Sequence, residues 1–106
     1  MLDVMTESTT AAEIFGNRVK DLRVALGLSQ SDASRLAIIN VSNFGKIERG
    51  VGGNPNLMTI IRIAGVLGVD PGELVTGIGV ESLPEATRVY TAMDFLAAKA
   101  KHEATS

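Results

Sequence analysis

The stretch LSQSDASRLAIINVSNFGKIERG, residues 28–50, decides the fold of this chain. Ser29 and Asn40 are residue types that favour the N-cap of a helix, and Gly50 is the type that follows a helix end. The stretch therefore predicts a short helix over 30–37, a tight turn and a second short helix that ends before Gly50. Helices of about two turns are unstable alone, so these two must pack on each other and on the rest of the chain. Two such helices joined by a tight turn make a helix-turn-helix pattern.

Capping signals and helically spaced apolar residues predict four further helices around this stretch. Thr10 and Glu13 have the spacing of a capping box, and Asp70 with Pro71 supplies an N-cap followed by proline at the first helical position. No convincing pair of strands is present in the sequence, so the predicted fold class is all-α. The four further helices run from Thr10 to Gly27, from Pro55 to Gly68, over 71–76 and from Ser82 to Ala100.

The predicted helices divide the chain into three parts. A length of 106 residues suits one domain with a tail. Residues 1–9 are polar and acidic, and they are predicted to form a flexible N-terminal arm. Residues 10–79 hold five helices, and residues 80–106 form a C-terminal amphipathic helix. Its apolar face carries Ala86, Val89, Tyr90, Met93, Leu96, Ala97 and Ala100.

The composition excludes several classes of site. The chain has no cysteine and a single histidine, His102, which excludes disulfides, thiol catalysis and metal sites built from cysteine or histidine. No apolar run reaches the roughly 20 residues of a membrane span, and the N-terminus lacks the basic start of a signal peptide. No nucleophile stands in a pattern with a base. We therefore expect a cytoplasmic protein that is not an enzyme, contacts no membrane and needs no cofactor.

Charge is distributed unevenly along the chain. The formal net charge is −2, but residues 14–50 hold six basic and three acidic side chains and form the only basic segment. That segment contains the helix-turn-helix pattern, and its positive charge favours a nucleic-acid partner. The alternative is that the excess of basic residues is a chance fluctuation in a short segment. The acidic total instead favours a protein-interaction module.

Three short motifs stand in register along the chain. They are Ser-Gln at 29–30, Ile-Glu-Arg-Gly at 47–50 and Asn-Pro-Asn-Leu at 54–57. Together with residues 28–50, they resemble the phage-repressor-like (Xre, Cro/CI-type) helix-turn-helix DNA-binding family. Residues 15–23 look like the first helix of that family, and residues 53–75 look like its fourth and fifth. The resemblance implies a five-helix, lambda-repressor-like DNA-binding domain with an additional C-terminal helix.

The resemblance implies two sets of DNA-contacting side chains. The set that faces bases comprises Val41, Ser42 and Lys46. The set near the DNA backbone or the groove edge comprises Asn40, Asn43 and Arg49. Gln30 matches a position that contacts a phosphate or buttresses the second helix of the pattern; the plainer interpretation is an ordinary exposed residue. Lys46 suits guanine O6/N7 or a phosphate, and Val41 suits a thymine methyl group. The plainer interpretations are a solvated lysine at Lys46, a core side chain at Val41 and helix-start polar residues at Ser42 and Asn43. Val41, Ser42 and Lys46 cannot make the strong bidentate base contacts of an arginine or glutamine, so DNA shape and phosphate contacts are expected to matter.

Three further positions carry expectations. Gly45 falls on the predicted exposed side of its helix, where a glycine would let backbone approach DNA closely. Glu48 resembles a family residue that pairs with an arginine of the first helix, here Arg23, in a structural ion pair. Ile38 stands where the family usually places glycine. Because a β-branched residue tolerates a positive φ poorly, we expect a differently shaped turn there.

One helix-turn-helix module buries limited DNA surface, so specific binding usually needs a two-fold dimer. We expect Val89, Tyr90, Met93 and Leu96 to form the dimer contact; the alternative is that this helix folds back onto its own domain. The predicted function is a transcriptional regulator, a repressor, that binds double-stranded DNA at an inverted repeat as a homodimer. The alternatives are an antitoxin or restriction-modification controller, with a toxin or other protein as partner, and an interaction module without DNA binding.

Overall fold

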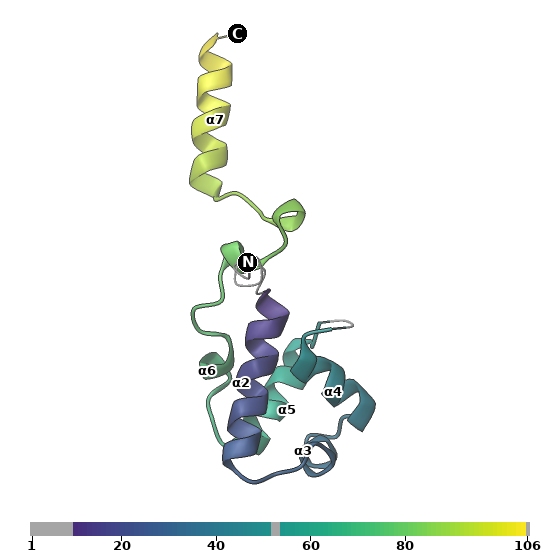
Figure 1. The fold of residues 1–106 in the computed structure, drawn as a ribbon. Coiled ribbons are helices and arrows are strands. Elements are labelled where there is room, and N and C mark those ends of the chain that lie inside the picture. The colour runs from purple at the N-terminus through teal and green to yellow at the C-terminus, as the bar shows by residue number, and fades with distance from the viewer. Residues whose placement is uncertain (1–9, 52–53, 106) are drawn as a thin grey trace, which may run out of the picture.

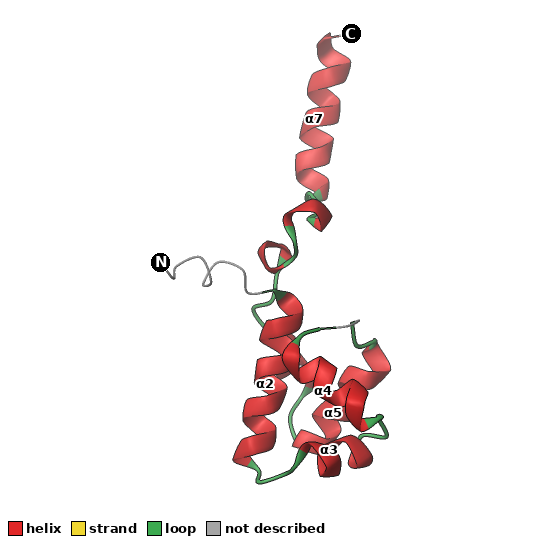
Figure 2. Cartoon of the chain, turned by 45° about the vertical axis from the view of Figure 1, so that its right-hand side comes forward, coloured by secondary structure: helices red, strands yellow, loops and turns green. Residues whose placement is uncertain are grey.

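The chain folds into α-helices and short turns throughout residues 10–51 and 54–105, the residues that the computed structural model describes. No strand is present among them, which confirms the all-α fold class (Figures 1 and 2). The elements in chain order are α2 (Ala11–Ala25), α3 (Gln30–Leu36), α4 (Val41–Arg49), α5 (Leu57–Leu67), α6 (Pro71–Val75), the 3-10 turns η1 (Val80–Ser82) and η2 (Glu85–Thr87), and α7 (Ala92–Thr105).

Helices α2, α3, α4 and α6 begin at the capping residues that the sequence predicts, and α5 begins after a cap at Asn56. At the start of α2, the Thr10 hydroxyl accepts from the Glu13 N–H at 3.2 Å, and the Glu13 carboxylate accepts from the Thr10 N–H at 2.9 Å. The remaining four helices have side-chain caps at Ser29, Asn40, Asn56 and Asp70. Each cap satisfies backbone donors that a helix start leaves open, and each stabilises its helix by about 1 kcal/mol.

The turn between α3 and α4 differs from the expectation. Ile38 has a φ of 59°, and it is the only non-glycine with positive φ in the described part of the chain. The Ile39 N–H donates to the Ser34 carbonyl at 2.8 Å, and the Ile38 N–H donates to the Arg35 carbonyl at 3.2 Å. These two bonds form a Schellman motif, which needs a left-handed residue just after the helix. The prediction of a differently shaped turn is therefore wrong. The two helix-end bonds hold Ile38 in the left-handed conformation that a glycine normally adopts at this position.

Helices α2 to α6 form the body of the molecule, and its core lies where α2, α4, α5 and α6 meet. Its largest fully buried side chains come one from each helix: Val19, Phe44, Ile63 and Leu74. Helices α2 and α4 approach closely at Gly16, where an added Cβ would lie 2.3 Å from the Ile47 carbonyl oxygen. Only glycine allows that approach, so α4 is held against α2 along one face and keeps the other face open.

Two arginines from the longer helices tie down the ends of the short ones. The Arg62 Nε of α5 donates to the Ala37 carbonyl at the end of α3, at 3.0 Å. The Arg18 Nη1 of α2 donates to the Leu74 carbonyl in α6, at 3.2 Å. Since α3 and α6 are too short to be stable alone, these bonds help to fix them on the body.

The predicted helix from Ser82 onward is wrong in its start. Leu83 precedes Pro84 and is extended, as steric conflict with the proline ring requires. The Arg88 guanidinium then donates to the carbonyls of Glu81 and Leu83, both at 3.0 Å. These bonds hold the segment in the two tight turns η1 and η2 in place of a helix.

Helix α7 begins only at Ala92, where the Thr91 hydroxyl accepts from the Asp94 N–H at 2.9 Å. Val89 and Tyr90 therefore lie in the irregular segment before α7, and the predicted continuous apolar face is interrupted. The helix stands away from the body (Figure 1), and all its residues described as to burial are exposed. The structure therefore does not show the alternative arrangement, in which this helix folds back onto its own domain. Among the described helices, none is long and apolar enough to span a membrane.

Candidate nucleic-acid interface

Helix α4 presents two faces of different character. Phe44 and Ile47 are buried in the core. Val41 is 49% exposed, so its interpretation as a core side chain is wrong. Exposed polar side chains accompany it on the open face: Asn40, Ser42, Asn43, Lys46 and Arg49. The helix therefore has the inward apolar and outward polar sides that a helix in the DNA major groove needs.

The start of α4 is fixed by Asn40. Its side-chain oxygen accepts from the N–H groups of Ser42 and Asn43, at 2.8 and 3.2 Å. Because the cap uses the amide oxygen of Asn40, the NH2 group of the same side chain remains available as a hydrogen-bond donor. The cap also fixes the backbone around Val41 and Ser42, two of the residues that the sequence assigns to base contacts.

A buried ion pair anchors the other end of α4. The Arg23 Nε and Nη2 of α2 donate to the two oxygens of Glu48, at 2.6 and 3.0 Å. The Arg23 Nη1 also donates to the Leu28 carbonyl at 2.8 Å. The hydrogen bond to Glu48 raises the pKa of Arg23 above its ordinary value, by more than burial lowers it. The predicted Arg23–Glu48 pair is confirmed, and its bidentate geometry fixes α4 relative to α2.

Gln30, the first residue of α3, joins this pair from the side. Its Nε2 donates to Oε1 of Glu48 at 2.8 Å. Because an ionised carboxylate only accepts hydrogen bonds, this contact fixes which end of the amide is nitrogen. The sequence prediction gave Gln30 either a phosphate contact or a buttressing role, and the structure shows the second.

Gly45 does not lie on the exposed side of α4, which corrects the sequence prediction. It is buried, and an added Cβ would lie 3.1 Å from Arg49 Nη1 and 3.7 Å from Gln30 Oε1. The glycine therefore sits beneath two neighbouring side chains, where its backbone cannot meet DNA directly. A nine-residue helix carries too few positions to separate a boundary residue from an exposed one by periodicity alone.

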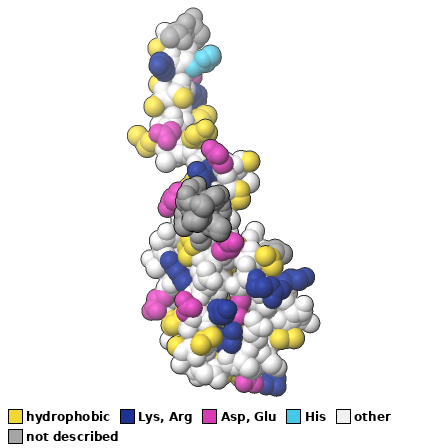
Figure 3. Space-filling view, viewed as in Figure 1, with side chains coloured by type: hydrophobic (Ala, Val, Ile, Leu, Met, Phe, Trp, Pro, Cys, Tyr) yellow, Lys and Arg dark blue, Asp and Glu magenta, His cyan; other side chains and the backbone are white. Residues whose placement is uncertain are grey.

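Basic side chains gather on the side of the body that carries α4. Figure 3 shows a group of Lys and Arg side chains there, with acidic side chains mainly toward the other side of the same view. Among the residues that the sequence assigns to DNA contact, Lys46 and Arg49 supply the positive charges of α4. A positive surface around an outward polar helix suits a phosphate backbone.

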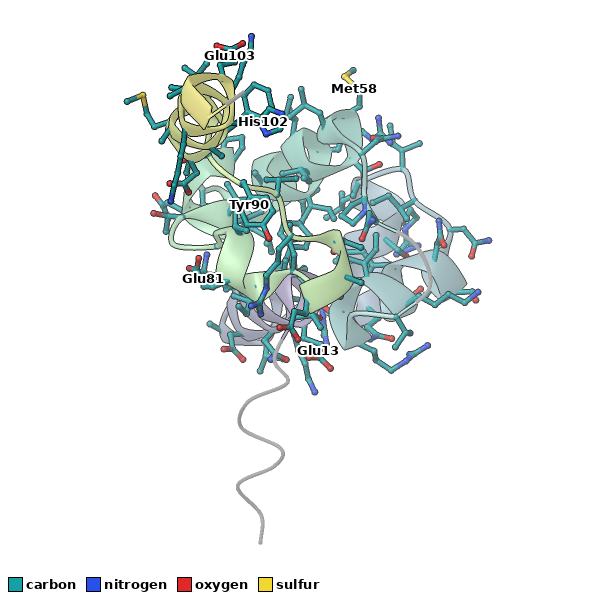
Figure 4. All side chains as sticks on the ribbon, turned by 90° about the horizontal axis from the view of Figure 1, so that it is seen from above. Glu13, Met58, Glu81, Tyr90, His102 and Glu103 are labelled. Atoms are coloured by element: carbon teal, nitrogen blue, oxygen red, sulfur yellow. The ribbon has the colours of Figure 1, made fainter. Side chains whose placement is uncertain are left out.

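The four predicted dimer residues do not share one helix face. Met93 and Leu96 lie in α7, whereas Val89 and Tyr90 precede it, and all four are exposed. Figure 4 shows Tyr90 on the segment leading into α7. Within residues 10–51 and 54–105, no group of three His, Cys, Asp or Glu side chains is placed to hold a metal ion.

Comparisons with known proteins agree with this geometry. A family model described as helix-turn-helix matches residues 19–74. The crystal structure of the restriction-modification controller protein C.AhdI from Aeromonas hydrophila is similar, with 38% identity and a TM-score of 0.57 over 59% of this chain and 94% of that chain. The SinR protein/SinI protein complex shares the fold, with 23% identity and a TM-score of 0.57 over 87% of this chain and 82% of that chain. A search of the curated proteins finds no match.

The match to the family model spans more than half of the 106 residues, and it contains α3, the turn and α4 in full. The confirmed Arg23–Glu48 pair and the two-faced α4 lie within it. The chain therefore belongs to the Xre-like helix-turn-helix family of DNA-binding transcriptional regulators.

Proposed function

We propose that this chain represses transcription by binding an inverted-repeat operator as a homodimer, with α4 of each copy in the major groove. The observation that carries the proposal is the composition of the open face of α4. Lys46 can donate to guanine O6/N7 or to a phosphate, Ser42 can donate or accept, and Val41 can contact a thymine methyl group. Bound there, the protein would block polymerase without catalysis, in the cytoplasm and without a cofactor.

The homodimer proposal rests on the state of α7. The helix has 14 residues, and every one described as to burial is exposed. An isolated helix of this length is marginal in water, so a partner surface must stabilise it. Met93, Leu96, Ala97 and Ala100 follow at +3, +4 and +7, which places them on one face that a second α7 can cover.

Analytical ultracentrifugation tests the dimer. The full chain should be dimeric at micromolar concentration, and a chain ending at residue 79 should be monomeric. A shortened chain that still dimerises would show that α7 is not the interface. Because α2 to α6 lie wholly within the shortened chain, it is expected to keep the fold of the body.

Selection of binding sites from a random-sequence DNA library tests the operator. The full chain should enrich an inverted repeat whose half-sites lie about 34–36 Å apart, one turn of DNA. Enrichment of single half-sites would contradict dimeric binding. No enrichment of any sequence, with no binding to duplex DNA at low salt, would favour an interaction module that has lost DNA binding.

A second candidate function is control of a restriction-modification system. The 38% identity to C.AhdI, over 94% of that controller chain, favours it. The test is whether the selected operator lies upstream of a restriction or methyltransferase gene beside the gene for this chain. A small toxin gene in that position would instead favour an antitoxin with the toxin as its protein partner.

A further inference from the structure

We propose that Arg88 determines which operator spacing the dimer accepts. The inference rests on the proposed function, in which two copies joined at α7 bind the two halves of an inverted repeat. In such a dimer, the position of α7 relative to the body sets the separation of the two α4 helices, and hence the separation of the half-sites that they reach together. The connection between α6 and α7, residues 76–91, therefore bears on specificity.

The first half of this connection lies against the body. Ile78 packs against the core, and Ser82 and Leu83 are half-buried. The last two line a hollow together with Thr10 and Ala11, at the start of α2. Figures 1 and 2 show η1 beside that end of α2. The chain is therefore held to the body as far as Leu83.

The second half of the connection is exposed and is tied back by Arg88. Residues 84–91 are exposed, and the backbone hydrogen bonds of η2 stay within that turn. The side chain of Arg88 joins the two halves: its Nε donates to the Leu83 carbonyl and its Nη2 to the Glu81 carbonyl, both at 3.0 Å. Because both acceptors belong to the first half, Arg88 ties η2 to backbone that the body holds. Residues 89–91 alone separate Arg88 from α7.

The chemistry of arginine suits this tie. The donors of a guanidinium point in fixed directions, so one side chain holds two carbonyls at once, whereas a lysine offers a single point of attachment. A fixed connection lets both α4 helices engage the duplex together at one spacing. A loose connection lets the two bodies adapt to several spacings. Loss of the tie should leave the body folded, because Glu81 and Leu83 lie outside its core.

The test measures affinity for duplexes that carry both selected half-sites, at the selected spacing and at spacings about 2 base pairs shorter and longer. Each change turns one half-site by about 70° around the duplex, since a turn holds about 10.5 base pairs. For the unmodified chain the change should lower affinity about 100-fold, a usual gain from binding two linked sites at once. For Arg88→Ala the loss should be no more than about tenfold, because the bodies can follow the half-sites. Affinity for a duplex with one half-site should be equal in both proteins.

Two further variants separate the tie from charge and from changes elsewhere in the segment. Arg88→Lys keeps the positive charge, and it should relax the spacing preference as Arg88→Ala does. Glu85→Gln changes an exposed side chain of η2 and should keep the strict preference of the unmodified chain. A strict preference in Arg88→Lys, or a relaxed one in Glu85→Gln, would show that charge in this segment sets the spacing and would overturn the inference.

Spin labels test the tie in the absence of DNA. The chain has no cysteine, so Lys20→Cys in α2 and Lys99→Cys in α7 place one label on each side of Arg88. Labelled chain diluted with excess unlabelled chain reports distances within one copy. The distance distribution should be narrow in the otherwise unmodified chain and broader with Arg88→Ala, and equal widths would overturn the inference.

Failure of the inference is distinguishable from failure of the proposed function. If the unmodified chain binds none of the duplexes, the proposed function fails, and the role of Arg88 in spacing fails with it. If the chain binds but tolerates every spacing, or if Arg88→Ala discriminates among spacings as steeply as the unmodified chain, only the inference fails.

Discussion

The body and α7 are both helical, but different interactions hold them. In the body, α3 has seven residues and α6 has five, lengths that cannot persist alone, and bonds from Arg62 and Arg18 tie them to longer helices. Helix α7 has 14 residues, yet it lies away from the body and is exposed. Helix length is therefore a poor guide to how well a helix packs in this chain. Contacts within one copy stabilise the body, whereas the dimer contact proposed above would stabilise α7.

Removing a buried carboxylate from the body, with an exposed carboxylate outside it as control, should give the largest change in stability. Glu48→Ala leaves Arg23, whose side chain is 10% exposed, without its counter-charge. We expect a loss of about 3–5 kcal/mol in the free energy of unfolding, measured by urea denaturation. Glu85→Ala, in the exposed segment before α7, is the control and should change it by less than about 0.5 kcal/mol. A loss below about 1 kcal/mol for Glu48→Ala would show that the buried pair does not hold α4 to α2.

A methyl group added between α2 and α4 should have the next largest effect. In Gly16→Ala the new Cβ would meet the backbone carbonyls of Ile47 and Glu48 at 2.3 and 2.5 Å, so the two helices must separate. We expect a loss of about 1–3 kcal/mol in the same urea measurement. An unchanged or higher stability would mean that the contact between these helices is looser than the structure shows.

Relieving the strained turn should stabilise the body. Ile38 is 79% exposed with a φ of 59°, so Ile38→Asn gives up little packing and replaces a residue that this conformation disfavours by about 1–2 kcal/mol. A gain of about 1 kcal/mol in unfolding free energy is expected. The same exchange at Ile61, inside α5, should lose about 0.5 kcal/mol because asparagine is a poor helix former. Loss of stability in Ile38→Asn would show that the isoleucine side chain packs more than its exposure indicates.

The surface pair of α3 should have the smallest effect. A hydrogen bond from Arg35, helped by one from Ser29, lowers the pKa of Asp32 below its ordinary value. The carboxylate therefore stabilises the fold above its unfolded pKa of about 3.9, and this contribution is lost as pH falls through the lower folded value. In Asp32→Asn the difference from the unmodified chain should shrink as the pH of a urea-denaturation series falls through that range. A difference that grows toward acid would contradict the lowered pKa.

The body could be predicted from the sequence because its signals are local. Thr10, Ser29, Asn40 and Asp70 cap helices through atoms within three residues, so spacing alone reveals them. Glycines at Gly27, Gly50 and Gly68 mark three helix ends in the same way. The Arg23–Glu48 pair joins residues far apart in sequence, and the family resemblance, not spacing, identified it.

The wrong predictions concern segments whose structure is determined by contacts that compete with a local signal or that come from another helix. The Ser82–Glu85 spacing imitates a capping box, but the bonds from Arg88 to two carbonyls and the extended residue before Pro84 prevent a helix there. The true start, Thr91 with Asp94 three residues later, was present in the sequence. Gly45 was misplaced because Arg49 and Gln30 cover it, and no helical pattern shows how a side chain folds over its own helix.

The salt dependence of Lys46→Ala on the selected duplex tests most directly whether α4 is the DNA-binding helix. The affinity of the unmodified chain should fall steeply between about 50 and about 200 mM salt. Lys46→Ala should weaken binding severalfold. The loss should be confined to sequences that carry one particular base, or it should occur on all sequences with the slope of log affinity against log salt reduced by about 1. Lys20 is an exposed lysine of α2, and Lys20→Ala should change the affinity little. Affinity of Lys46→Ala equal to that of the unmodified chain at every salt concentration would contradict the account.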